Sequence, residues 1–332
     1  MNSYPTLQDV AKRSGDPKVS AMVEVLNQNN PMLDDIPWIE ANSGVSHITT
    51  IRTGIPTPVW RMLNSGVPNA KSTSKQITAH CGMLEVYAEV DKKLVDLAKR
   101  NGGQDGASNY LASENKAFIE GFGQEIARVT FYGDNSKPQE PVGLIHYYNK
   151  VATSAKETNV IDGGGTTDKG NTSIWLVGWG ADTIHGLYPQ GSKAGLSESY
   201  LGEHTVKDAD GNQFQALRTH YTWDAGLAVR DWRYGARIAN IDMEAILNNP
   251  EGAANILKLL TLATYKLPTA ANNARRAFYM RKEILTALDL QIQTKANLML
   301  NYETVEGRKV LTFRGIPLRE QETLSTTEAR VK

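Results

Sequence analysis

The sequence lacks the features that would hold a small or specialised scaffold together. It contains one cysteine, Cys81, so no disulfide can form within the chain and no thiolate cluster exists for zinc. No segment approaches the ~18 apolar residues that a membrane-spanning helix needs, and the N-terminus has no apolar signal core. These absences exclude disulfide-rich, zinc-stapled and membrane-spanning classes, and we expect a soluble protein that folds in a reducing cytosol, without a membrane partner.

The chain also lacks a net charge, because 36 Lys and Arg residues balance 36 Asp and Glu residues. A dedicated nucleic-acid binder needs a basic surplus, so neutrality argues against that class. The charges nevertheless alternate in blocks: residues 1–45 carry 3 basic and 6 acidic side chains, 46–111 carry 8 and 5, 112–251 carry 12 and 18, and 252–332 carry 13 and 7. This alternation is consistent with ordinary pairing within one subunit or with oppositely charged surfaces meeting between copies.

Catalytic signatures are missing as well. The sequence has no P-loop, no HExxH and no GxSxG motif, and its six histidines are scattered. The glycines of VIDGGGTTDKGN precede no helix, which indicates a surface loop, and Asp208 to Gly211 indicate a β-turn because Val206 and Leu217 occupy the first and last calcium-ligand positions. Cys81 has no base beside it on the same strand face. We therefore expect no catalytic residue, no cofactor and no metal site.

What is present is an ordinary globular composition, with 332 residues of which 40% are hydrophobic and 22% charged. The length suggests about two domains. Residues 19–26 (VSAMVEVL) have apolar side chains at helical spacing. The stretch from 46 to 90 predicts two long strands joined by a polar tip near residues 64–75, with Pro56 and Pro58 compatible only with an edge or a bulge. Such a hairpin is marginal alone in water, so it should lie against another element.

Helical periodicity is strongest in residues 113–132. Phe118, Phe122, Ile126 and Val129 fall on one face there, after a shorter helical stretch at 91–98 and a glycine-rich break at 101–106. Two glycines within the helix, at 121 and 123, favour close packing of a strand or a neighbour.

The second half alternates strands and helices. Residues 141–241 predict several strands, residues 249–251 (NPE) predict a helix start before a stop at Pro268, and residues 282–294 predict a second helix. A short strand (AFYM) precedes the second helix, and a hairpin turning at residues 306–307 follows it. The chain therefore belongs to the α+β class.

Two groups of side chains have alternative interpretations. Arg275 and Arg276, close to Phe278 and Tyr279, are compatible with a nucleic-acid strand, a solvated face or a subunit contact. The tryptophans at 175, 179, 223 and 232 are compatible with a ligand cleft, a core or an interface.

The order of these parts resembles the major capsid proteins of tailed bacteriophages with the Hong Kong 97-type fold, in particular those of short-tailed phages. Three stretches carry the resemblance: TTIRTGIPTPVWRMLNSG with MLEVYAEVDKKL, ENKAFIEGFGQEIARVTFYGD, and ARRAFYMRKEILTALDLQ with GRKVLTFRGIPLRE. The resemblance implies an N-terminal arm (1–45), an extended loop (46–90), a mainly peripheral domain (91–248) with a spine helix (113–132), and a mainly axial domain with C-terminal strands (249–332).

The resemblance also implies a function. It is that of a structural protein, not an enzyme, which forms hexamers and pentamers of an icosahedral head around double-stranded DNA, is assembled in the bacterial cytoplasm and remains in the virion. Its implied partners are copies of itself, scaffolding and portal proteins, a decoration protein, and DNA through weak contacts. We expect Arg52, Trp60, Arg61, Arg275 and Arg276 to take part in assembly. Two alternatives are a nanocompartment shell that encloses protein cargo and an uncharacterised hydrolase or ligand-binding protein.

Overall fold

The computed structural model describes residues 30–151, 159–249, 255–268, 274–294, 300–305 and 308–332. Its helices are α3 (Met32–Asp35), α4 (Lys92–Tyr132), α5 (Leu144–Tyr147), α6 (Met243–Asn248), α7 (Ile256–Lys266) and α8 (Lys282–Thr294), with a 3-10 turn η1 (Trp232–Tyr234). Its strands are β1 (Trp38–Glu40), β2 (Ser46–Gly54), β3 (Thr73–Asp91), β4 (Val160–Asp162), β5 (Asn171–Trp179), β6 (Ile184–Tyr188), β7 (Ser197–Lys207), β8 (Gln213–Val229), β9 (Gly235–Asp242), β10 (Arg275–Met280), β11 (Leu300–Val305), β12 (Arg308–Phe313) and β13 (Ile316–Glu320). The α+β class predicted from the sequence is confirmed.

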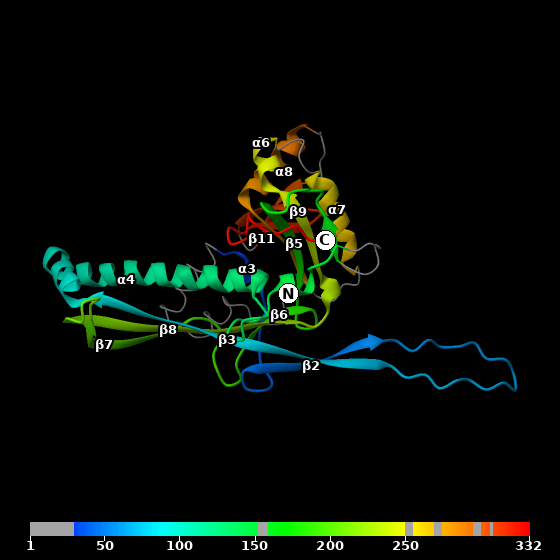
Figure 1. Ribbon diagram of the computed structural model, residues 1–332, viewed down its shortest axis with the longest axis horizontal. Helices are drawn as coiled ribbons and strands as arrows, with labels where there is room; N and C mark the ends of the chain where they lie inside the picture. The colour runs from blue at the N-terminus through cyan, green and yellow to red at the C-terminus, as the bar shows by residue number, and fades with distance from the viewer. Residues whose placement is uncertain (1–29, 152–158, 250–254, 269–273, 295–299, 306–307) are drawn as a thin grey trace.

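Two long strands organise the elongated part of the molecule. The first half of β3 pairs with β2 as the predicted hairpin, and its second half pairs antiparallel with β8. Strand β7 extends this sheet on the other side of β8. Figure 1 shows α4 running along β3 and β8 in one direction while the β2–β3 hairpin reaches out in the other. The apolar side of α4 packs on the sheet in the largest hydrophobic cluster, which includes Phe122, Ile126, Tyr221 and Trp223.

Helix α4 is longer than the predicted spine helix. It ends at Tyr132 as expected, where Gly133 donates to the carbonyl of Val129 at 2.8 Å, but it begins at Lys92, and Asp91 accepts from the Lys93 backbone N–H at 2.8 Å. The predicted break at 101–106 is present as a sharp turn within the helical stretch: Gly103 has a φ of 66°, and a Cβ on Gly106 would lie 2.4 Å from the carbonyl oxygen of Ala98. Eight residues of a straight helix span about 12 Å, so the chain changes direction here between two helical segments.

The upper body in Figure 1 is built around β5, all nine residues of which are buried. Strand β5 pairs with β9 and β10, and side chains from these strands share a second hydrophobic cluster with α7 and α8. Helix α8 has the predicted bounds and α7 ends before Pro268 as predicted. Helix α7 starts later than the NPE motif suggested, because Asn255 caps it by accepting from the Lys258 backbone N–H at 3.2 Å. The motif itself falls partly outside the described residues.

Several short or polar described elements escaped the sequence analysis, among them β7 and α6. Strand β7 (SESYLGEHTVK) is polar on most of its length and lies at the sheet edge, so it has little of the alternation that marks a half-buried strand. Helix α6 is only six residues long and begins after Asp242, which accepts from the Ala245 backbone N–H at 3.0 Å. The predicted hairpin around 306–307 is present as the pair β11–β12, although its turn lies outside the described residues.

The predicted N-terminal arm is only partly tested. The stretch 19–26 lies outside the described residues. Residues 30–41, in contrast, belong to the body: Met32, Leu33, Ile36 and Trp38 are buried in the largest hydrophobic cluster, and β1 pairs with β6. An arm extending to residue 45 is therefore wrong for this part of the chain, because these apolar side chains find their partners within the subunit.

A buried ion pair joins the upper body to α4 and to the C-terminal residues. The Arg237 guanidinium contacts the Glu328 carboxylate at 2.7 Å, and both side chains are almost fully buried. Arg237 also donates to the Ser173 hydroxyl at 2.9 Å and to the Tyr148 carbonyl at 2.9 Å. The Tyr132 hydroxyl at the end of α4 donates to the other oxygen of Glu328. Strands β5 and β9, α4 and the C-terminal segment therefore meet at one charged cluster.

We predict that Glu328→Gln lowers the free energy of unfolding by about 3–5 kcal/mol, because it leaves the Arg237 charge buried without compensation. Urea denaturation of the unassembled subunit, followed by circular dichroism, measures the change. The control Asp182→Asn removes an exposed carboxylate that contacts Arg230 at 2.8 Å and should cost less than about 1 kcal/mol. Equal losses for the two variants would contradict this role of the buried pair.

Candidate functional site

The most conspicuous surface is the tip segment, residues 55–72, which joins β2 to β3 beyond the last paired residues. Its described backbone hydrogen bonds include only one turn contact, from Ser65 to Met62 at 3.3 Å. Six large apolar side chains are exposed there: Ile55, Val59, Trp60, Met62, Leu63 and Val67. Exposed apolar side chains gathered on one segment mark an interaction surface. The tip segment therefore has the composition of an interface and makes few contacts of its own.

The structure places the assembly residues of this hairpin in different settings. Trp60 is fully exposed and Arg61 is exposed beside it, both within the tip segment. Arg52 lies on β2, where its backbone pairs with Ser74 of β3 next to a register shift. Trp60 and Arg61 thus lie on the unpaired tip segment, whereas Arg52 lies on the paired part of the hairpin.

Arg275 and Arg276 are engaged within the subunit, so a free basic surface is wrong for them. Arg275 contacts the fully buried Asp35 carboxylate at 2.9 Å, and Arg319 contacts the same carboxylate at 3.1 Å. Arg276 donates to the Pro268 carbonyl at 2.6 Å. The aromatic side chains that follow on β10 are completely buried, which removes the stacking platform that a nucleic-acid strand would need.

The sequence analysis missed Asp35 because the first 45 residues were interpreted as an arm. The Tyr279 hydroxyl also donates to Asp35, at 2.7 Å, and burial beside this carboxylate raises the pKa of Tyr279 well above its usual value. The signal that was available is the position of Asp34 and Asp35 within an otherwise apolar stretch, MLDDIPW. A carboxylate in such a context needs cationic partners when it is buried.

The base of the hairpin contains a second feature that the sequence analysis missed. His47 of β2 and His185 of β6 lie edge to face, with ring centroids 5.7 Å apart. Burial lowers the pKa of His185 to about 3, with the nearby His47 and Arg230 adding to the effect. Cys81 is buried close by, and burial raises its pKa to about 11, in agreement with the predicted structural thiol. His185 and Cys81 therefore have shifted pKa values because they are buried where the hairpin packs on the body.

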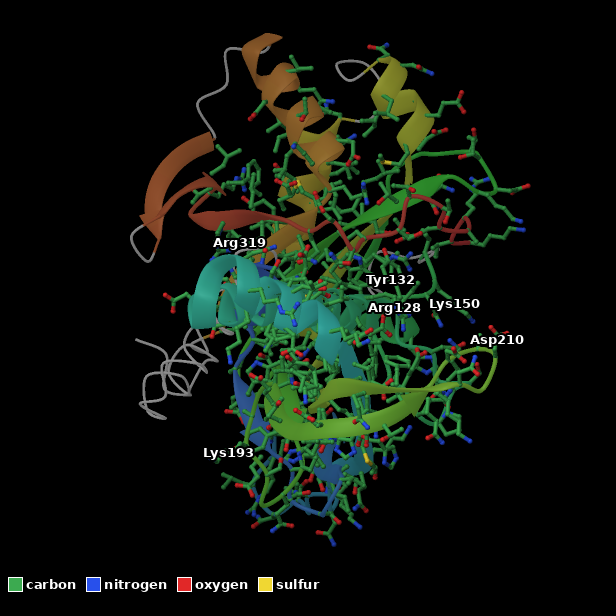
Figure 2. All side chains as sticks on the ribbon, turned by 90° about the vertical axis from the view of Figure 1, so that its left-hand side faces the viewer. Arg128, Tyr132, Lys150, Lys193, Asp210 and Arg319 are labelled. Carbon is green, nitrogen blue, oxygen red and sulfur yellow. The ribbon has the colours of Figure 1, made fainter. Side chains whose placement is uncertain are left out.

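The remaining sequence motifs are structural. Asp208 accepts from the backbone N–H groups of Asp210 and Asn212 at 3.0 and 2.8 Å, which forms the predicted turn between β7 and β8, where Figure 2 labels Asp210. Trp175, Trp179 and Trp223 are core residues and Trp232 is partly exposed. Within the described ranges, no three His, Cys, Asp or Glu side chains cluster as a metal site would require. None of the described helices is long and apolar enough to cross a membrane.

The comparisons with known proteins decide the family. The model of the family described as Major capsid protein GP7 matches residues 14–332. The chain belongs to this family of major capsid proteins. The capsid protein is also similar to a chain in the structure of bacteriophage Epsilon15, with 31% identity over 90% of this chain and 88% of that chain and a TM-score of 0.66. The resemblance to tailed-phage capsid proteins and the Hong Kong 97-type fold are thus confirmed.

More distant structures also match the capsid protein. A chain of the bacteriophage JBD30 capsid is 8% identical over 89% of this chain and 91% of that chain, with a TM-score of 0.45. A chain from the capsid of a native GTA particle is 10% identical over 62% and 88%, with a TM-score of 0.41. A comparison with curated protein sequences finds no match. The family match and the similarity to the Epsilon15 chain show that the capsid protein is a structural component of a virion that associates with its own copies, and not an enzyme.

We predict that the stability of the capsid protein subunit falls as the pH decreases from about 6.5 towards 3. The pKa of His185 is about 3 in the folded state and near 6.5 when the chain is unfolded, so the unfolded state binds more protons in this window. The slope from this residue is at most about 1.4 kcal/mol per pH unit. Urea midpoints between pH 7 and 4 measure it.

The variant His185→Leu should flatten this pH dependence, because it removes the buried imidazole. His146→Leu, which replaces an exposed histidine, should leave the slope unchanged. An unaltered slope in His185→Leu would assign the acid sensitivity to other groups.

Proposed function

We propose that the capsid protein forms the hexamers and pentamers of an icosahedral tailed-phage head that encloses double-stranded DNA, with the tip segment lying on a neighbouring subunit. The observation that carries this proposal is the exposure of large apolar side chains on a hairpin that projects beyond the body (Figure 1). A projecting hairpin is marginal in water, and a neighbour's surface supplies the missing burial. Contacts of this kind are heterologous and close into rings.

Within this proposal the domains divide as follows. Residues 46–80 form the extended loop, which is shorter than the 46–90 expected from the sequence because residues 81–91 of β3 pair with β8. This second half of β3, with α4, β7 and β8, forms the peripheral domain. The axial domain holds α7, α8 and the C-terminal strands, and it also takes β5 and β9 because their side chains share one hydrophobic cluster with those helices. The contact residues between subunits are Trp60 and Arg61, with Arg52 at the paired end of the hairpin. Arg275 and Arg276 support assembly indirectly by fixing β10.

The finer partners follow from the resemblance to phage capsid proteins. They are a separate scaffolding protein, a portal protein and a decoration protein, with weak, non-specific contacts to the packaged DNA. Assembly takes place in the host bacterial cytoplasm. A phage head is favoured over a cargo-filled nanocompartment because the family match and the Epsilon15 similarity are both to phage capsid proteins.

We predict that Trp60→Ala reduces the yield of assembled particles at least about tenfold. A Trp side chain buried in an interface is a frequent hot spot, and a loss of about 1.4 kcal/mol in the free energy of association weakens a contact tenfold. Arg61→Ala should act in the same direction. Negative-stain microscopy and sedimentation of the assembly reaction measure the yield, and circular dichroism confirms that the subunit remains folded.

The matched control is Thr57→Ala, which changes an exposed residue of the same segment without removing a large apolar surface. It should assemble normally. A normal particle yield for Trp60→Ala would exclude the tip segment as the main intersubunit contact.

We also predict that assembly is sensitive to ionic strength. Surfaces of opposite sign on neighbouring subunits attract less as the Debye length falls from about 10 Å at 0.1 M salt to about 3 Å at 1 M. Light scattering should therefore show slower assembly at 1 M than at 0.1 M sodium chloride. Equal rates would show that the charge blocks along the sequence do not meet between subunits.

A further inference from the structure

A groove of about 430 Å³ lies between α4 and β3. Its floor is apolar and its rim carries three carboxylates. The lining residues are Leu84, Glu85, Val86, Glu114, Ala117, Phe118, Gly121, Phe122 and Glu125. Two of the rim carboxylates have contacts already, Glu85 with His220 at 3.1 Å and Glu125 with Arg128 at 2.6 Å. The groove therefore offers a helix-sized apolar surface beside an acidic edge.

Gly121 keeps this groove open. Glycine in the interior of a helix destabilises it relative to alanine, so a close approach is the usual reason for its presence. A Cβ placed on Gly121 would have no atom of the described residues within 4 Å. The close packing expected at this glycine is thus not made by a described strand of the subunit, and it is available to a segment that enters the groove.

The described part of the chain begins close to this groove. Asn30 and Pro31 line a second pocket together with Glu120 and Gln124 of α4. At about 100° per residue, Glu120 and Gln124 lie on the face of α4 adjacent to the one that carries Gly121 and Phe118. Asn30, the first described residue, therefore lies one helix face away from the groove.

The sequence of the segment before Asn30 fits the groove. Val19, Met22, Val23 and Leu26 fall at offsets 0, 3, 4 and 7, which place them on one side of a helix. Such a helix, 19–26, is about 12 Å long, and the α4 side of the groove from Glu114 to Glu125 is about 17 Å long. The four residues from Leu26 to Asn30 span up to about 13 Å, which is enough to cross between neighbouring helix faces.

Charge does not select the occupant, because residues 1–29 carry three basic side chains, Lys12, Arg13 and Lys18, and three acidic ones, Asp9, Asp16 and Glu24. The fit rests on length, apolar pattern and the position of Asn30. We propose that residues 19–26 dock as a helix in the groove between α4 and β3 of the same chain, with their apolar side against Phe118 and Gly121. This docking does not depend on the function of the shell, since it is a property of the single subunit.

A disulfide test distinguishes this occupant from others. In the unassembled full-length subunit, Val23→Cys combined with Gly121→Cys should form an intrachain disulfide on mild oxidation, visible as a faster-migrating monomer on a non-reducing gel. The matched control pairs Val23→Cys with Ala112→Cys, nine residues earlier and on the opposite side of α4. Native Cys81 is buried with a pKa of about 11, which keeps it out of the exchange at pH 8.

Preferential crosslinking at position 121, at least tenfold over position 112, supports the proposal. Crosslinked dimers in place of monomers would assign the groove to a neighbouring copy, and equal crosslinking at both positions would show that the segment does not dock; either result overturns the proposal.

Hydrogen exchange gives a readout that does not rely on cysteine variants. Residues 84–86 and 114–125 should exchange at least about tenfold more slowly in the full-length chain than in a chain that lacks residues 1–26. Equal rates, or protection that arises only after a second protein is added, would also overturn the proposal.

Discussion

The buried ion pair between Arg237 and Glu328 is the interaction on which the arrangement of the subunit depends. It lies where β5, β9, the end of α4 and the C-terminal residues converge, and each of these elements contributes a group to it. A buried charge is tolerated only with its partner in place, so the four elements must be assembled together. The pair thereby fixes the direction in which α4 leaves the body, and with it the position of the long sheet that packs on α4.

The body and the tip segment differ in how far their side chains find partners within the subunit. In the body, buried carboxylates have cationic partners, as Asp35 has in Arg275 and Arg319, and the strands around β5 are covered by helices. In the tip segment, large apolar side chains are exposed and few backbone groups are paired. This division agrees with the proposed assembly, in which a rigid body sets the geometry of the shell and the exposed tip segment is buried by the next copy.

Sequence patterns predicted the elements that depend on neighbouring residues and missed those that depend on contacts between distant parts of the chain. The ends of α8, the end of α4 at Gly133 and the β2–β3 hairpin follow from periodicity, caps and turn residues. The helical residues between the turn at Gly103 and residue 113 did not, because the apolar periodicity that marks the long helix begins only at Phe118. Within the candidate site, the lack of a paired strand around Trp60 was foreseeable from Pro56, Pro58 and Gly66. The pairing of Arg275 with Asp35, in contrast, joins residues too distant in sequence for any local pattern.

These long-range pairs also change the meaning of the alternating charge blocks. Asp35 of the acidic first block binds Arg275 and Arg319 of the basic last block, and Arg237 of the acidic third block binds Glu328 of the last. Part of the alternation is therefore satisfied inside one subunit. The tip segment is different, since it carries Arg61 and Lys71 and no acidic residue. Its exposed charge is basic, so the surface that receives it on a neighbouring subunit should be apolar at its centre and acidic at its edge, which is the pattern expected of a steering contact around a hydrophobic anchor.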